Sequence, residues 1–355
     1  MSAAGDELRV DVVIDNFNYG RFLAAAIESA LAQTHPVTRV IAVDDGSTDH
    51  SLEVLRGYAD RVEVVLKENG GQASALNAGF ERCRGDVVIF LDADDLLHPE
   101  AVARAAAALA AAPSAAKAQL RMEVVDAEGR PTGELKPPPR LPMPSGDLRR
   151  AELAYPFDLA WLPTSANAFR TEQLRAIMPI PTDGYRVGAD WYLIHLSTLL
   201  GGVATVEEVS CAYRVHGDNN YEPQAAELDL DHVRETIGYG ATTGAELLAL
   251  AAGLGLPHPE EILSVADLGQ RLISLRLDPA RHPIAGDSRW SLLRDSVAAA
   301  RRRDNAALPL RAAFVAWFTA MAIAPRPLAR RLAAWFLFPA RRSALGSLFG
   351  RLQRR

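Results

Sequence analysis

The sequence lacks the marks of several protein classes. It contains two cysteines, Cys83 and Cys211, which lie far apart and form no Cys-x-x-Cys pair. We therefore expect no metal–thiolate site, and we expect a reducing compartment. The first residues, MSAAGDELRV, show neither the basic nor the apolar segment of a secretory signal, so no signal peptide is expected. No internal repeat is visible.

The composition is that of a globular protein. Of the 355 residues, 49% are hydrophobic, 23% are charged and 7% are aromatic. This is enough apolar surface to bury a sizeable core, and it excludes a disordered chain, a collagen and a disulfide scaffold. The length predicts about two domains, or one α/β domain with a sizeable appendage.

The charge is distributed unevenly along the chain. The net charge is −6, but residues 301–355 hold twelve arginines and one acid, Asp304, and so carry +11. The first 300 residues therefore carry −17. A globally acidic body does not fit a nucleic-acid partner, whose phosphates need a broad basic surface. The basic tail needs another explanation.

The first hundred residues alternate short apolar runs with segments of helical periodicity. The apolar runs, rich in Val and Ile, predict buried strands at 8–14, 39–43, 62–66 and 86–91. Helical spacing of apolar residues predicts helices at 20–33, 49–59, 72–82 and 98–112. Alternation of strand and helix predicts a parallel sheet with right-handed crossovers.

Ser47 or Thr48 is expected to cap the helix 49–59. The elements after residue 112 are more varied. The later part predicts a strand at 117–125, a turn at 126–129 and an exposed loop at 131–146, which holds six prolines. Helices at 171–177 and 189–200 and a strand at 204–215 come next, and the chain is almost continuously helical from about residue 228.

Carboxylates gather where two predicted strands end. Asp44 and Asp45 follow the strand 39–43, and Asp92, Asp94 and Asp95 follow the strand 86–91. In open parallel sheets, ligands bind outside the carboxyl ends of the strands, so both clusters should face one crevice. So many acids repel one another unless a cation is present. An oxygen-rich site of this kind suits Mg²⁺ or Mn²⁺ bridging to substrate phosphates.

Together these residues resemble the inverting glycosyltransferases of family 2, which have the GT-A fold. The resemblance covers roughly residues 8–220. It rests on the order and spacing of VVIDNFNYGRFLAAAIESALAQTHP, VDDGSTDHS, NGGQASALNAG, IFLDADD, GADWYL and YRVHGDNN. It implies an α/β fold of the GT-A (Rossmann-like) type, with a mostly parallel sheet and helices on both faces. To this the chain adds an α-helical C-terminal appendage.

On the donor side, the resemblance implies that Asp44 hydrogen-bonds the nucleotide base. Asp92 and Asp94 form the family's Asp-x-Asp motif, in which the first reaches the ribose or the metal and the second binds Mn²⁺ or Mg²⁺ on the diphosphate. Phe17 stands where the nucleotide base would stack. The alternative is that its side chain belongs to the hydrophobic core. The predicted donor-binding residues are Asp15, Asn16, Phe17, Asp44, Asp45, Gln72 and Asp92.

On the acceptor side, Asp190 stands at the position of the family's catalytic base, which takes a proton from the acceptor hydroxyl. Considered alone, it would be read as a helix N-cap. His216 follows a Tyr-Arg pair, where relatives place a histidine near the diphosphate. The predicted metal ligands are therefore Asp92, Asp94 and His216, and the alternative for His216 is a packing role. The predicted acceptor-binding residues are Ser165, Asn167 and Trp191.

The predicted function is that of a metal-dependent, inverting hexosyltransferase. It moves a sugar from a nucleoside-diphosphate sugar, with UDP-sugars favoured, to a hydroxyl of a glycan or lipid-linked acceptor in polysaccharide or glycolipid assembly. Two alternatives stay open. A sugar-nucleotide pyrophosphorylase would need a Gly-rich, Arg-containing loop after the first strand, and residues 15–20 do not provide it. A non-catalytic scaffold should have lost some of these acids.

We expect three regions along the chain. Residues 1–220 form the catalytic domain, with a nucleotide-sugar half at about 8–125 and an acceptor half at about 126–220. A helical extension at 221–300 and basic amphipathic helices at 301–355 follow. The oligomeric state is not predicted.

The tail interleaves Trp and Phe with arginine clusters. Its apolar segment 312–324 has thirteen uncharged residues, short of the about 20 that span a membrane. The pattern predicts helices that lie on an anionic membrane surface, and hence a cytoplasmic enzyme on the inner face of the cell membrane. The alternative is a helical appendage that packs on the catalytic domain with its arginines toward solvent.

Overall fold

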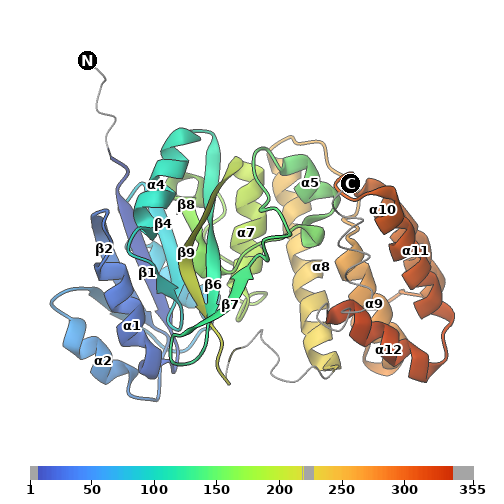
Figure 1. Ribbon diagram of the computed structural model, residues 1–355, viewed down its shortest axis with the longest axis horizontal. Coiled ribbons are helices and arrows are strands. Elements are labelled where there is room, and N and C mark those ends of the chain that lie inside the picture. Colours follow the sequence, from blue (N-terminus) through green and yellow to red (C-terminus); the bar gives the residue numbers. More distant parts are fainter. Residues whose placement is uncertain (1–6, 218, 220–227, 339–355) are drawn as a thin grey trace. The chain divides into compact units, whose positions relative to one another are not determined.

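The computed structural model describes residues 7–217, 219 and 228–338 (Figure 1). The chain divides into two compact units. Unit 1 comprises residues 1–149 and 160–218, and unit 2 comprises residues 150–159 and 219–355. The sheet belongs to unit 1, whereas the long C-terminal helices belong to unit 2. We did not predict that residues 150–159 group with the C-terminal helices.

Unit 1 is built around one large sheet. Its strands are β1 (Val10–Asn16), β2 (Val37–Asp44), β3 (Glu63–Leu66), β4 (Val87–Asp92), β5 (Leu96–Leu97), β6 (Ala115–Val125), β7 (Pro131–Lys136), β8 (Asn167–Arg170) and β9 (Gly202–Arg214). The order is β3-β2-β1-β4-β8-β6-β9-β5, with β7 paired to β6. Strands β1 to β4 pair in parallel, whereas β8 is antiparallel to both of its neighbours.

Helices cover both faces of this sheet. They are α1 (Gly20–Leu31), α2 (Ser51–Tyr58), α3 (Gln72–Phe80), α4 (Ala101–Ala111), α6 (Thr171–Leu174) and α7 (Ala189–Leu200). Val12 and Ile14 of β1 share a buried cluster with Leu23 of α1. The intervening Val13 faces α3, where a Cβ on Gly79 would lie 2.3 Å from Val13 Cγ1. Alternate residues of a buried strand therefore meet different helices, and the predicted fold class is confirmed.

Two local predictions are wrong. The segment 131–146 is not all loop, because residues 131–136 form β7, which pairs antiparallel with β6. Its proline stands at the first position of an edge strand, where no ladder hydrogen bond is lost. Neither Ser47 nor Thr48 caps α2: the N-cap residue is His50, and Asp49 Oδ1 accepts from the Ser51 N–H at 2.9 Å.

Unit 2 is a helical assembly with its own core. Its helices are α5 (Arg149–Ala154, entering from unit 1), α8 (Leu230–Gly253), α9 (Val265–Leu277), α10 (Arg289–Arg302), α11 (Leu308–Ile323) and α12 (Arg326–Leu337). Trp317 and Phe318 are buried in this core, and the Trp317 ring stacks on Phe336 at 4.3 Å between centroids. A Cβ on Gly269 of α9 would lie 2.3 Å from Phe336, so glycine is required where α12 approaches.

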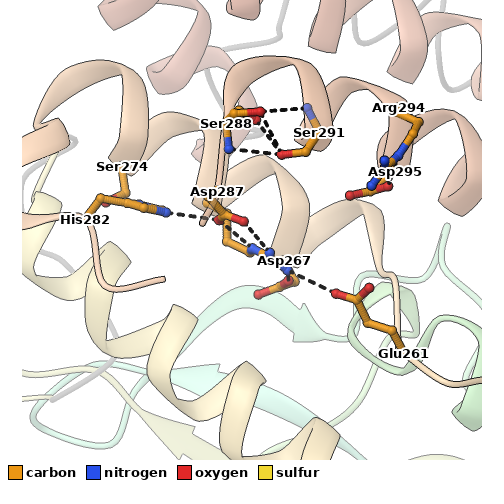
Figure 2. A network of polar contacts seen from close by, with 10 residues as sticks. Glu261, Asp267, Ser274, His282, Asp287, Ser288, Ser291, Arg294 and Asp295 are labelled. Atoms are coloured by element: carbon orange, nitrogen blue, oxygen red, sulfur yellow. Dashed lines mark hydrogen bonds and ion pairs between the residues drawn. The ribbon is translucent and has the colours of Figure 1, made fainter. Parts of the chain in front are cut away.

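A polar network also joins α9 to the start of α10 (Figure 2). Arg271 donates to both carboxylate oxygens of Asp287, at 2.9 and 2.6 Å, and lies 3.4 Å from Asp267. His282 Nε2 lies 3.0 Å from Asp287 Oδ2. Burial raises the pKa of Asp267 to about 6 despite the opposing charge of Arg271. Ser288 and Ser291 form a capping box that begins α10.

The packing of unit 2 indicates the role of the aromatic residues in the basic tail. Within residues 7–217, 219 and 228–338, no helix is both long and apolar enough to cross a membrane. Trp317 is core, and Trp335 and Phe336 pack against that core. The aromatic residues of α11 and α12 therefore pack inside unit 2. Phe349 and the last five arginines lie outside the described residues.

Candidate active site

The carboxyl ends of β1, β2 and β4 bring the predicted acids together. In the sheet register, Asp15 is paired with Asp92, and Asn16 is paired with Asp44. Because these strands are parallel, their ends lie at one edge of the sheet. Asp94 follows in the turn after β4. The structure thus brings both predicted acid clusters to this edge of the sheet.

The acids at this edge are poorly solvated and repel one another. Burial, and next the charge of Asp94, raise the pKa of Asp15 to about 7. Burial and neighbouring acids also raise the pKa values of Asp92 and Asp95 well above the usual range. Asp15 Oδ1 and Asp95 Oδ2 are buried without a hydrogen-bond partner. A proton or a cation at this edge would relieve the repulsion.

The last residue of β1, Asn16, is hydrogen-bonded to the end of β2, just before the turn that follows β2. Asn16 Nδ2 donates to Asp44 Oδ2 at 2.8 Å, and the Ser47 N–H donates to Asp44 Oδ1 at 2.9 Å. Asn16 and Asp44 are 2% and 1% exposed, and their side chains bond to each other. Phe17 is 44% exposed, and the alternative that it is a core residue is wrong.

Asp45 holds the glycine loop that precedes α3. Its Oδ1 accepts from the Gly70 N–H at 3.0 Å and its Oδ2 from the Gly71 N–H at 2.7 Å. Lys67 forms an ion pair with the same carboxylate. Gly71 has a φ of 85°, which favours glycine. Asp45 is buried, and its carboxylate binds this loop. It therefore fixes the shape of the loop on the donor side.

Asp190 lies in the first turn of α7. The N-cap position belongs to Gly188, with a φ of 76°, so the N-cap interpretation of Asp190 is wrong. Asp190 Oδ1 accepts from the adjacent Trp191 N–H at 2.9 Å, and burial raises the pKa of its carboxyl. The charge of Asp190 also contributes to the raised pKa of Asp92. The predicted base therefore lies near the predicted donor-binding acids.

His216 lies between Asp94 and Arg21. Arg21 Nη2 is 3.2 Å from His216 Nδ1, and His216 Nε2 is 3.0 Å from Asp94 Oδ2. A guanidinium can only donate, so Nδ1 accepts and Nε2 carries the proton that is donated to Asp94. Both ring nitrogens are engaged, and through Nε2 His216 supports the Asp94 carboxylate.

The described residues contain no group of three or more His, Cys, Asp or Glu side chains that could hold a metal ion. Asp92, Asp94 and His216 are therefore not a ready-made three-ligand site. The neighbouring carboxylates of Asp92 and Asp94 still fit Mg²⁺ or Mn²⁺, because these ions take further ligands from water and substrate phosphates. The unpartnered buried oxygens of Asp15 and Asp95 agree with a site that lacks positive charge.

The structure does not support two of the acceptor-binding predictions. Ser165 and Asn167 are 0% exposed. Ser165 Oγ accepts from the Asp92 N–H at 3.1 Å, and Asn167 Nδ2 donates to the Leu162 and Pro163 carbonyls. Ser165 therefore supports the backbone at Asp92, Asn167 holds the turn that precedes β8, and neither side chain has an exposed surface for a sugar. Trp191 is partly exposed next to Asp190, as a sugar contact requires.

Sequence reasoning missed Arg21 and the role of Arg214. Arg214 donates its backbone N–H to Asp95 Oδ1 at 3.0 Å and its Nε to the Asp94 carbonyl at 2.8 Å, and so fixes the turn after β4. Its place beside His216 in the Tyr-Arg pair was a usable signal. Arg21 offered only its position in the first turn after β1, which no motif singles out.

The chain is similar to known proteins over much of its length. The Glycosyl transferase family 2 model matches residues 11–158. An uncharacterized glycosyltransferase of Nostoc sp. is 32% identical over 239 residues, which cover 66% of this chain and 73% of that protein. The undecaprenyl-phosphate 4-deoxy-4-formamido-L-arabinose transferase of Pseudomonas fluorescens is 42% identical over 103 residues, which cover 27% of this chain and 30% of that protein.

One solved structure gives the same picture of the fold. Staphylococcus aureus TarS 1–349 in complex with UDP is similar with a TM-score of 0.50 and 16% sequence identity. The match covers 93% of this chain and 89% of that one. At this identity the likeness concerns the fold alone.

Proposed function

The chain belongs to glycosyltransferase family 2, and from this premise we propose that it is a metal-dependent, inverting enzyme. It transfers a hexose from a nucleoside-diphosphate sugar, UDP-sugars being favoured, to a hydroxyl of a glycan or lipid-linked acceptor. The observation that carries the proposal is the meeting of Asp92 and Asp94 at the sheet edge with Asp190 on a separate helix close by.

Asp92 and Asp94 would hold Mg²⁺ or Mn²⁺ together with the donor diphosphate. When bound, such a cation neutralises the charge of the departing nucleoside diphosphate. His216, itself held by Arg21, keeps the Asp94 carboxylate in place through a contact of 3.0 Å. The exposed ring of Phe17 lies at the end of β1, where it can stack on the nucleotide base.

Asp190 would act as the general base. Its carboxylate takes the proton from the acceptor hydroxyl while the acceptor oxygen forms a bond to the anomeric carbon. The bond from that carbon to the diphosphate oxygen breaks on the opposite face, so the product has the inverted configuration. A pKa raised by burial makes Asp190 a stronger base than an exposed carboxylate.

We propose that the acceptor side works at an anionic membrane surface. The +11 charge of residues 301–355 supports this, and Arg330 and Arg331 of α12 are exposed. The Pseudomonas relative is named for an undecaprenyl-phosphate acceptor. Since the aromatic residues of α11 and α12 pack inward, the attraction rests on arginine charge, and the protein would lie on the cytoplasmic face as a peripheral enzyme.

A screen of nucleotide sugars by thermal shift, with and without Mn²⁺, tests the function. We expect one donor to raise the melting temperature only with metal in the wild type, and no donor to do so in Asp94→Ala. NMR of the product should then show an anomeric configuration opposite to that of the donor. Pyrophosphate exchange would instead indicate a nucleotidyltransferase, and binding without turnover a scaffold.

A further inference from the structure

The Gln72 side chain lies between the donor-binding acids and the helix that carries Asp190. Its Nε2 donates to Asp92 Oδ1 at 3.2 Å. Its Oε1 accepts from the Gly188 N–H at 3.1 Å and from the Ala189 N–H at 3.0 Å. One amide thus joins the end of β4 to the first residues of α7.

The orientation of this amide follows from its partners. Backbone N–H groups can only donate, so the carbonyl oxygen of Gln72 must face Gly188 and Ala189. The NH₂ group then faces Asp92, whose carboxylate can only accept when ionised. No other uncharged side chain of this length offers an acceptor at one side and a donor at the other.

The surrounding backbone reinforces the connection. The Gln72 N–H donates to the Arg186 carbonyl at 2.7 Å, and the Ala73 N–H lies 3.4 Å from the Tyr185 carbonyl. A Cβ on Gly71 would lie 2.4 Å from the Arg186 carbonyl oxygen. The start of α3 and residues 185–189 are therefore in close contact, and the Gln72 amide extends this contact to Asp92.

We propose that Gln72 is a positioning residue that couples the donor-binding carboxylate Asp92 to the placement of the base Asp190. This inference rests on the proposed function, because it takes Asp190 as the base. When the donor engages Asp92, the amide holds the first turn of α7 at a fixed distance from the reacting carbon. Without the amide, the donor still binds Asp92, but Asp190 is no longer held in a fixed position relative to the bound donor.

The chain contains a matched control in Gln33. Its Nε2 donates to the Ser29 and His98 carbonyls and its Oε1 accepts from the Val102 N–H, so one contact lies at the end of α1 and two reach the start of α4. None of these three partners is an acid of the site. Gln72→Met and Gln33→Met each keep the length of the side chain and remove the hydrogen bonds of its amide.

The coupling predicts different kinetics for the two variants. With the donor found by the nucleotide-sugar screen, Gln72→Met should lower kcat by about 10²-fold, as a small misplacement of a catalytic group does. Gln72 was predicted to bind the donor, but its amide is engaged by Asp92, Gly188 and Ala189. The Kd of Gln72→Met for UDP with Mn²⁺, measured by calorimetry, should therefore stay within about threefold of wild type. Gln33→Met should lower the melting temperature and leave kcat within about twofold. Equal kcat in the wild type and Gln72→Met, or equal losses in both variants, would overturn the proposal.

Hydrogen exchange tests the coupling without turnover. In the protein without nucleotide, Gln72→Met should speed exchange of the Gly188 and Ala189 amides by at least about tenfold, whereas Gln33→Met should not. UDP with Mn²⁺ should slow these amides in the wild type alone. Unchanged exchange in Gln72→Met contradicts the inference even if the enzyme is active. If no nucleotide sugar is turned over, the proposed function fails, while exchange at these two amides still decides whether Gln72 holds α7. Should Gln72→Met not fold, Gln72→Asn, one methylene shorter, replaces it.

Discussion

Asp45 and Asp190 are both acids of the site, yet their carboxylates do different work. Asp45 accepts two backbone N–H groups of the glycine loop and pairs with Lys67. Asp190 accepts the N–H of the adjacent Trp191, and its pKa is raised by burial. A carboxylate that already holds a loop cannot take up a proton without loosening it. Asp190 can accept a proton at a smaller structural cost.

Replacing Asp190 by Asn should therefore remove catalysis and spare binding. The amide cannot accept the acceptor proton, so we expect kcat to fall by about 10²–10⁴-fold. Calorimetry with UDP and Mn²⁺ should give a Kd close to that of wild type. Asp183→Asn, in an exposed position of the preceding loop, is the control and should keep full activity. A variant Asp190→Asn with near-normal kcat would show that the base lies elsewhere.

Single residues differ in how far the sequence predicts them. Asp92 and Asp94 follow a strongly apolar strand, so their place at the sheet edge is predictable from the pattern of β4. The burial of Ser165 and Asn167 is not, because it depends on how β8 inserts between β4 and β6. The Arg21–His216 contact joins residues 195 positions apart, and no local spacing indicates it.

At the scale of elements, α3 packs closely on the sheet because Gly79 has no side chain. Gly79→Ala would place a Cβ 2.3 Å from Val13 Cγ1 and 3.2 Å from Val43 Cγ2, both in the buried sheet. We expect a loss of about 1–3 kcal/mol in the free energy of unfolding, measured with urea. Gly57→Ala in α2 has no atom within 4 Å of the added Cβ and should be neutral or stabilise by up to about 1 kcal/mol. Similar values for the two variants would contradict this account of the α3 packing.

The polar network at the start of α10 predicts a pH dependence (Figure 2). The pKa of Asp267 is about 6 in the folded protein, against 3.8 for an aspartate side chain in water. The folded state therefore binds this proton more tightly than the unfolded state, and ionisation costs stability as the pH rises between these values. Asp267→Asn should be more stable than wild type by about 2–3 kcal/mol at pH 8, and the difference should vanish below about pH 4.

Urea unfolding of both proteins across this pH range measures the effect. The control is Asp231→Asn, because this carboxylate, which pairs with the largely buried Arg234 and the exposed Arg281, is itself 63% exposed. Its effect should stay within about 0.5 kcal/mol at every pH. A difference between Asp267→Asn and wild type that does not change with pH would show that Asp267 does not carry a raised pKa.

Elements were predictable where one pattern dominates. The apolar runs of β1, β2 and β4 and the helix 189–200 follow from periodicity alone. β7 was missed because prolines signal loops, although the first position of an edge strand tolerates them. The cap of α2 was misassigned because Ser47 and Thr48 bond instead to the β1–α1 turn, through the Asn18 N–H and Asn18 Oδ1.

At the scale of the whole molecule, charge and packing in the tail must be separated. The net charge of +11 on residues 301–355 follows from the sequence, but the inward packing of Trp317 does not, since an aromatic residue suits a membrane interface and a protein core equally well. Deleting everything from Arg301 would remove α11 and α12 from the core of unit 2. A deletion of residues 339–355 removes five arginines and leaves every described helix in place.

We expect the full-length protein to float with phosphatidylglycerol vesicles at low salt. Each arginine near an anionic surface contributes about 1 kcal/mol, so the deletion of 339–355 should abolish flotation. Replacing the exposed Arg330 and Arg331 by Gln should weaken it by a smaller amount. Because such charges are screened over about 10 Å at 0.1 M salt, flotation should also fall as salt is added. The truncated protein should keep its melting temperature and its affinity for UDP. If the full-length protein stays in solution at low salt, the tail is a packed appendage and the proposal of a membrane surface is wrong.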